Sequence, residues 1–330
     1  MAKRRRRWSP LAPGIPFWIA EDVQDWVYEL FSSANRYVSR AYSRVPSTNE
    51  PHLDTCLLSD LQLFKDAALL PSGYKVQLHA LSGAGRSHYH GREIADIIVL
   101  VTFEQSGSPA RTKIVLFQSK RLYPYSKTGP VYATPSVAAI YHPTARAVLT
   151  AASATIEFKS DCKYMALKAQ DAQQTNIENF TNDSAMPVYY LLYHPHKRLP
   201  TTLGIPVRHA AEPKGANLLG CRVVPFAAMK NAMNALAKGQ SPSYDELCNK
   251  LPSSMQPHPG AKNQFRLERF MADMVMGCHI GTFVETLTPK QQVVLQPLVR
   301  IDGAFAVSRE IGEEGPAVIA MTITAPPLAG

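Results

Sequence analysis

The sequence has few of the features that mark secreted, zinc-clustered or membrane proteins. Its 330 residues include five cysteines, and no two of these are spaced as Cys-x-x-Cys. Such a scattered, odd-numbered set disfavours a disulfide framework or a zinc site and indicates reduced thiols. Apolar runs such as Ile97–Val101 fall far short of the roughly 20 residues that cross a bilayer. We therefore expect a soluble, cytoplasmic protein with no membrane partner.

Charged residues are also scarce, and the positive ones are concentrated at the N-terminus. Only 18% of the residues are charged, and the net charge is +9. Lys3 and Arg4–Arg7 supply five positive charges, which leaves 30 basic against 26 acidic side chains elsewhere. We expect residues 1–20 to form a basic, flexible arm, which either attracts phosphate groups or only adds solubility. Prolines follow the basic residues and interrupt any apolar stretch, which disfavours a secretory signal.

The chain does contain enough apolar material for a folded core. Forty-five per cent of its residues are hydrophobic, which excludes an intrinsically disordered chain. Residues 21–46 carry apolar side chains at three- and four-residue spacing and predict an amphipathic helix. Arg36, Arg40 and Arg44 form a row beside this apolar stripe. They either contact phosphates or form a solvated face.

Residues 47–200 predict a mixed α/β core. A helix is expected to begin at about residue 50, after capping residues and before a proline in its first turn. Its buried face is predicted to comprise Leu53, Leu57, Leu61, Phe64 and Ala68. A change of period then predicts three strands, a helix and a fourth strand. These elements are residues 74–81, 94–103, 113–122, 161–180 and 187–193, with an insertion at about 123–160.

Residues 215–330 are expected to form a C-terminal α/β region of unknown role. A strand is predicted at residues 221–224, and helices are predicted near 227–237 and 265–278. Cys278-His279 lies at the end of the second helix and has the composition of a thiol–base pair. The apolar stripe that precedes it favours a buried, structural cysteine on that helix instead.

Three polar residues interrupt the predicted strands of the core. Asp96 lies near the start of a strand otherwise made of Ile, Val and Leu, and Gln118 and Lys120 lie at the end of the next strand. Alternate residues of a strand share a face. One face of residues 113–122 therefore carries Ile114, Leu116, Gln118 and Lys120, and the other carries Val115, Phe117 and Ser119. Because buried polar groups need partners, we expect antiparallel pairing to bring Asp96 beside Gln118 and Lys120.

A carboxylate, an amide oxygen and an ammonium group at one sheet edge suit chemistry that depends on Mg²⁺ or Mn²⁺. Hard oxygen ligands bind Mg²⁺, and the bound ion activates water and neutralises charge on a phosphodiester. A second acid from the preceding helix would complete the site. Glu50 is expected to project towards the sheet and ranks above Asp54, which is expected at the edge of that face. Glu93 and His90 are further candidate ligands, and the alternative is a surface Asp–Lys pair without chemistry.

With Asp96, Gln118-Ser119-Lys120 and the order α-β-β-β-α-β, residues 48–195 resemble the PD-(D/E)XK, or restriction-endonuclease-like, superfamily. The similarity is greatest to its Mrr-type branch, in which glutamine replaces the usual acid. The resemblance implies that Asp96 is the principal metal ligand, Gln118 the third-strand ligand, Lys120 the catalytic lysine and Glu50 the helix acid. The sequence departs from the family in having Ala95 instead of proline before Asp96, and in its long insertion.

The resemblance implies a Mg²⁺-dependent DNA endonuclease of bacterial restriction or anti-phage defence. The candidate nucleic-acid contacts are Arg36, Arg40, Arg121, Lys127, Gln170 and Gln174. Gln118 is neutral and holds a metal less tightly than a carboxylate does. A catalytically inactive nucleic-acid-binding module is therefore the alternative, as is a structural subunit that assembles with a defence-system partner or with further copies of itself.

Overall fold

The computed structural model describes residues 19–45, 48–81, 87–89, 92–126, 129–130, 158, 161–195, 220–251, 264–295, 301–302, 306–307 and 316–327. The expected basic arm up to residue 18, most of the expected insertion, His90 and Lys127 lie outside these residues. Within the described part of the chain, no helix is both long enough and apolar enough to cross a membrane.

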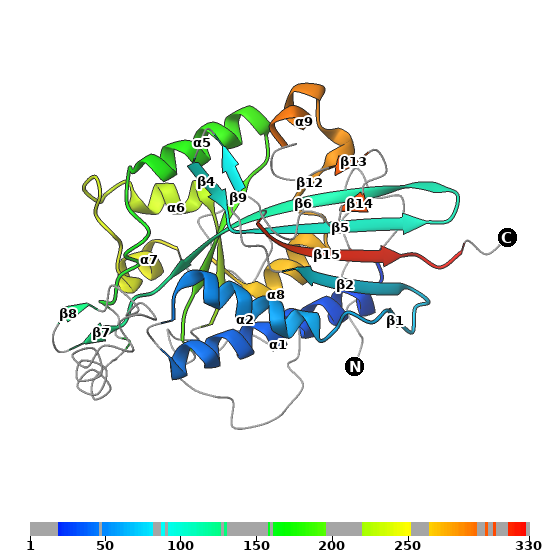
Figure 1. Ribbon diagram of the computed structural model, residues 1–330, viewed down its shortest axis with the longest axis horizontal. Helices are drawn as coiled ribbons and strands as arrows, with labels where there is room; N and C mark the ends of the chain where they lie inside the picture. The colour runs from blue at the N-terminus through cyan, green and yellow to red at the C-terminus, as the bar shows by residue number, and fades with distance from the viewer. Residues whose placement is uncertain are drawn as a thin grey trace, which may run out of the picture.

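A mixed sheet of nine strands forms the centre of the protein (Figure 1). Eight strands follow the order β1-β2-β15-β5-β6-β9-β10-β11, and β12 pairs with β6. Their bounds are β1 Ala68–Leu69, β2 Lys75–Leu81, β5 Ile97–Gln105, β6 Ser108–Arg121, β9 Val188–Tyr193, β10 Arg222–Pro225, β11 Phe265–Arg266, β12 Thr282–Phe283 and β15 Ala317–Thr324. The smaller pairs are β3 Ser87–Tyr89 with β4 Arg92–Ala95, β7 Tyr125–Ser126 with β8 Gly129–Pro130, and β13 Ile301–Asp302 with β14 Ala306–Val307.

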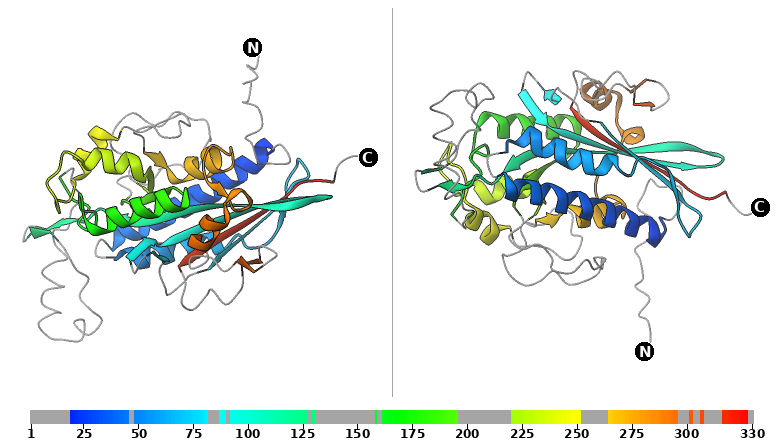
Figure 2. Two further views of the ribbon diagram at one scale, coloured as in Figure 1. Left: turned by 90° about the horizontal axis from the view of Figure 1, so that it is seen from above. Right: turned by 60° about the horizontal axis from the view of Figure 1, so that its bottom comes forward.

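Helices cover both faces of the sheet, which makes the fold mixed α/β as expected. On one face α1 (Glu21–Arg44) and α2 (Glu50–Gln62) lie side by side, next to α8 (Leu267–Arg269) and a π-helix at Phe270–Val275 (Figure 2). On the other face α5 (Ala172–Ser184), α6 (Phe226–Met233) and α7 (Tyr244–Lys250) pack with a separate apolar cluster. A 3-10 helix (Val284–Thr286) and α9 (Pro289–Leu295) complete the described helical elements.

The C-terminal strand β15 occupies the middle of the sheet. It pairs antiparallel with β2 and parallel with β5, so it separates two strands that are close in sequence. Val318, Ile319, Met321 and Ile323 of this strand are all buried. Strands β10 and β11 likewise extend the sheet beyond β9. Residues 215–330, expected as a separate region, thus supply four strands of the same central sheet, β10, β11, β12 and β15.

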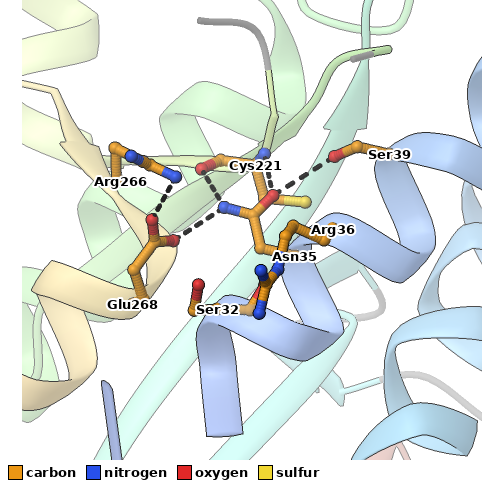
Figure 3. Close-up of polar contacts among 7 residues, drawn as sticks. All are labelled: Ser32, Asn35, Arg36, Ser39, Cys221, Arg266 and Glu268. Carbon is orange, nitrogen blue, oxygen red and sulfur yellow. Dashed lines mark hydrogen bonds and ion pairs between the residues drawn. The ribbon is translucent and has the colours of Figure 1, made fainter. Parts of the chain in front are cut away.

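A buried polar network fastens α1 to the outer strands (Figure 3). The Asn35 side chain accepts a hydrogen bond from the Cys221 amide at 2.7 Å and donates one to Glu268 at 2.7 Å. Glu268 is fully buried and forms an ion pair with Arg266 at 2.5 Å. A Cβ at Gly220, where φ is +112°, would lie 3.0 Å from the Asn35 side-chain oxygen. Glycine at this position therefore allows both the backbone conformation and the close approach of Asn35.

Most predicted elements are confirmed, and four are corrected. The predicted strand at 94–103 is divided at Asp96, since residues 94–95 belong to β4 and β5 begins at Ile97. The predicted helix at 161–180 begins only at Ala172, because Asp171 caps it by accepting from the Gln174 amide at 2.8 Å. The helix at residue 50 ends at Gln62, so Phe64 and Ala68 are not on its buried face. The predicted helix at 265–278 is a short strand, one turn of α-helix and a π-helix. Local periodicity does not separate these forms, because they bury the same apolar residues.

Candidate active site at the ends of β5 and β6

The hairpin of β5 and β6 brings the predicted polar residues together. The two strands pair antiparallel with Ile97 opposite Phe117, and the Asp96 amide donates to the Phe117 carbonyl at 2.8 Å. Asp96 therefore lies just before β5, level with the end of β6 that carries Gln118 and Lys120. The predicted alternation of faces is also confirmed: Val115 and Phe117 belong to the apolar cluster under α1 and α2, and Ile114 and Leu116 to the other cluster.

Asp96 is held by two donors from β6. Its Oδ2 accepts hydrogen bonds from the Gln118 side-chain amide at 2.5 Å and from the Ser119 backbone amide at 2.6 Å. The Gln118 amide nitrogen also donates to Glu93 on β4 at 3.3 Å. The expectation that Asp96 and Gln118 meet across antiparallel strands is confirmed, and Glu93 joins them. Lys120, expected beside Asp96 as well, forms no hydrogen bond or ion pair with it among the described residues, although its charge acts on Asp96.

Helix α2 contributes two acids, and the deeper one is Asp54. Its Oδ1 accepts hydrogen bonds from the Ser119 hydroxyl and the Tyr193 hydroxyl, both at 2.6 Å. Glu50, one turn earlier, accepts from the Arg121 backbone amide at 3.1 Å. The expectation that Asp54 lies at the edge of the buried face is therefore wrong. The buried stripe of α2 passes through Leu53, Asp54, Leu57, Leu58 and Leu61, which places Asp54 inside it.

Local sequence fixes where α2 begins and hence where its two acids lie. The Asn49 side chain caps the helix by accepting from the His52 amide at 3.0 Å, and Pro51 stands in the first turn. Both features favour a helix start at this point, as predicted. Glu50 and Asp54 are four residues apart, so they lie on the same side of the helix and both face β6.

The electrostatics of the site are dominated by buried carboxylates. Burial raises the pKa of Asp96 well above its ordinary range, a hydrogen bond with Glu93 and the charge of Asp54 add to this, and the charge of Lys120 lowers it. Burial also raises the pKa of Asp54 to about 7, against hydrogen bonds from Ser119 and Tyr193 that lower it. Lys120, only 5% exposed, is thus one ammonium group among several acids. A second cation would relieve this surplus of negative charge.

One buried oxygen of the site has no hydrogen-bond partner within the described residues. Gln118 donates its amide nitrogen to Asp96 and Glu93, and its Oε1 is left buried and without a partner. Among these residues no group of three or more His, Cys, Asp or Glu side chains is arranged to hold a metal. An amide oxygen and one or two carboxylates nevertheless suit Mg²⁺, which keeps several of its waters. The donor set therefore fits a divalent ion that binds through few protein ligands.

The side chains of the predicted nucleic-acid contacts that the structure describes form no hydrogen bond or ion pair with Asp96, Gln118 or Asp54; Arg121 reaches the site only through its backbone amide, which donates to Glu50. Arg36 donates to the Ser32 carbonyl of its own helix at 3.2 Å, and Arg40 is exposed. Arg121 is buried with its guanidinium stacked 3.9 Å from the centre of the Tyr123 ring. Gln174 is buried at the start of α5, where its side chain accepts from the Gln170 amide at 2.6 Å.

Sequence reasoning missed two hydroxyl groups that position Asp54. The sequence predicts Ser119 only as a strand residue on the opposite face from Gln118, and Tyr193 only as the end of a strand. A hydroxyl at each position is visible in the sequence, but its partner is not. Parallel pairing of β6 with β9 sets Ser119 opposite Leu191, so the end of β9 lies next to the end of β6.

The raised pKa of Asp54 predicts a pH-dependent gain in stability for Asp54→Asn. The native state holds the Asp54 proton more tightly than the unfolded chain does, because the pKa is about 7 instead of the ordinary 3.8. Wild-type stability should therefore fall as the pH rises from about 4 to about 7. Asparagine keeps the oxygen that accepts from Ser119 and Tyr193 but carries no charge. The variant should match the wild type near pH 4 and exceed it at pH 8, by a few kcal/mol at most at about 1.4 kcal/mol per pKa unit.

Thermal unfolding at the two pH values measures this difference. Asp66→Asn is the matched control, since Asp66 is exposed and its substitution should leave the unfolding temperature unchanged at both pH values. An Asp54→Asn variant that is less stable than the wild type at pH 8 would show that the carboxylate is a net stabilising group.

Comparison with known proteins gives no relative from which to transfer a function. No family model matches the chain, and neither a curated protein nor a solved structure matches it.

Proposed function

We propose that the protein is a Mg²⁺- or Mn²⁺-dependent nuclease that hydrolyses phosphodiester bonds, with DNA as its substrate in bacterial restriction or anti-phage defence. The observation that carries the proposal is the contact of Asp96 with Gln118 at the ends of β5 and β6, with Lys120 close enough for its charge to act on Asp96 and with Asp54 bonded to the intervening Ser119. The resemblance to the PD-(D/E)XK superfamily implies Asp96, Gln118 and Lys120 in these roles, but it implies Glu50 as the helix acid where the structure buries Asp54 more deeply. The basic residues of the chain would attract the phosphate backbone.

The arrangement of the core adds support to the restriction-endonuclease-like assignment. The long elements between residues 50 and 193 run α2, β2, β5, β6, α5 and β9, with β6 antiparallel to β5 and parallel to β9. The insertion of β15 between β2 and β5 is an addition to that order. We therefore propose the restriction-endonuclease-like core together with the nuclease function.

In the proposed reaction, Asp96 and the Oε1 of Gln118 would hold the divalent ion, with Asp54 and Glu50 on α2 beside them. A bound ion supplies a water of lowered pKa and neutralises charge on the attacked phosphate. Lys120 would place its ammonium group on the phosphate oxygens and stabilise the charge that develops there. Asp96, Glu93 and Glu50 are partly exposed, so a phosphate would approach from their side.

One observation favours a second candidate, an inactive nucleic-acid-binding module. The Gln118 amide nitrogen already satisfies Asp96 and Glu93, so Gln118 can act as a structural link between two acids instead of as a ligand. In that case the buried polar cluster would stabilise the hairpin without metal. A structural subunit of a defence complex would share this arrangement.

Incubation of the full chain with plasmid DNA and Mg²⁺ or Mn²⁺ separates these candidates. The proposal predicts cleavage that EDTA stops and that Asp96→Asn removes, with Asp66→Asn as an active control. It also predicts that Mg²⁺ raises the unfolding temperature of the wild type at pH 8 and not that of Asp96→Asn. DNA that is bound but never cut with either ion would favour the binding module, and a chain that neither binds nor cuts would favour the structural subunit.

A further inference from the structure

A buried lysine on β6, in the part of the strand remote from Asp96, contacts a cysteine in a turn. Lys113 Nζ lies 2.9 Å from Cys278 Sγ and donates to the Val275 carbonyl at 2.9 Å. The contact joins β6 to the turn that follows the π-helix, across 165 residues of sequence. The expectation that Cys278 is buried on a helix is wrong, because it lies in this turn, where its φ is +58°, and is partly exposed.

The surroundings hold the Lys113 amine in this position. The lysine is 1% exposed, and its Nζ lies 5.7 Å and 5.0 Å from the ring centres of Phe103 and Phe283. A Cβ at Gly281 would lie 2.5 Å from the Lys113 side chain, so the absence of a side chain there gives the lysine its space. Burial lowers the pKa of Lys113, although contact with Cys278 raises it in part. A lower pKa increases the fraction of the neutral amine, and only that form has a lone pair that can act as a nucleophile.

The thiol differs from the amine in being reachable from solvent. Cys278 is partly exposed, whereas Lys113 is buried behind it. All five cysteines lie within the described residues and are free thiols. An oxidised Cys278 sulfur would already be in contact with a nucleophile, the Lys113 nitrogen.

We propose that Lys113 and Cys278 form an oxidative modification site, at which hydrogen peroxide converts the contact into a covalent nitrogen–sulfur cross-link between β6 and the turn after the π-helix. This inference is independent of the proposed nuclease activity. Neither residue belongs to the group of Asp96, Glu93, Asp54 and Glu50 at the other end of β6.

The chemistry needs peroxide as its single oxidant. The Cys278 sulfur attacks one peroxide oxygen, so that a sulfur–oxygen bond forms and the oxygen–oxygen bond breaks. The departing hydroxide takes the thiol proton and leaves as water. The sulfur loses two electrons and becomes a sulfenic acid. The Lys113 lone pair then attacks that sulfur, a nitrogen–sulfur bond forms, and the hydroxyl leaves with one amine proton as a second water. The product is a sulfenamide, and excess thiol reduces it back to cysteine and lysine.

Mass spectrometry of the full chain after mild peroxide treatment tests the site directly. We expect a product lighter than the reduced chain by two hydrogen atoms, which a thiol reductant reverses. A disulfide would have the same mass, so the product is digested with trypsin. The cross-link predicts that cleavage after Lys113 is lost and that its peptide is joined to the peptide that contains Cys278.

Two variants complete the test. Cys278→Ser should abolish the cross-linked peptide. Lys113→Met should leave the sulfenic acid uncaptured, so that labelling of Cys278 by a 1,3-dione after peroxide treatment rises several-fold above the wild type. The peptide map is measured on the wild-type protein, so this part of the test does not depend on whether a variant folds. Oxidised wild-type protein in which Cys278 is labelled by the dione and Lys113 is still cleaved by trypsin would overturn the proposal.

Discussion

Replacing Lys120 with methionine is expected to reduce metal-dependent DNA cleavage by a factor of about 10²–10³ or more, while the fold survives. The reason is that the ammonium group would stabilise charge only as the phosphodiester is attacked. Methionine fills a similar volume in the buried position that Lys120 occupies. Gel-based cleavage of plasmid DNA under single-turnover conditions measures the loss.

Metal binding by the same variant should not fall with the activity. Lys120 lowers the pKa of both Asp54 and Asp96, so its removal makes both acids hold their protons more tightly. Once the acids are ionised, however, the variant lacks a positive charge that repels a divalent cation. Titration calorimetry with Mn²⁺ at a pH high enough to ionise both acids should therefore give equal or tighter binding. Lys230→Met is the matched control, because Lys230 contacts Glu178 at 2.5 Å on a partly exposed face of α6. Full cleavage by Lys120→Met would refute the catalytic role of Lys120.

A chain that ends at residue 316 is expected not to fold. The deletion removes β15, whose eight residues pair with β2 on one side and β5 on the other. The sheet would lose two rows of backbone hydrogen bonds at its centre, and the apolar side chains of both helical layers would lose their partners. Circular dichroism and thermal unfolding should show no cooperative transition.

A chain that ends at residue 327 is the matched control for this truncation. It keeps the whole of β15 and the Ala325 amide, which donates to the Glu104 carbonyl at 2.8 Å. We expect it to unfold at the temperature of the full chain. A chain ending at residue 316 that unfolds cooperatively at a similar temperature would show that β2 and β5 can close the sheet without β15.

About half of the candidate site could be predicted from the sequence. Asp96 and Gln118 come from one hairpin, whose register is set by a short turn after Gln105 and by the buried alternation of its strands. Their pairing is therefore a local property. The role of Asp54 could not be predicted in the same way, because its donors lie 65 and 139 residues away on β6 and β9. A helix pattern shows which residues share a face, but not which residue of that face meets a hydroxyl on another element.

The sequence by itself determined the two helices α1 and α2 and the long strands β2, β5 and β6, since periodicity and capping act over a few residues. It also determined the two faces of β6, because side chains alternate along any extended strand. Only the tertiary structure decided that β15 enters the sheet between β2 and β5, that Asp54 lies under Ser119, and that Lys113 meets Cys278. These contacts join residues far apart in the chain, and they form because burying apolar surface and satisfying buried polar groups are properties of the whole packed molecule.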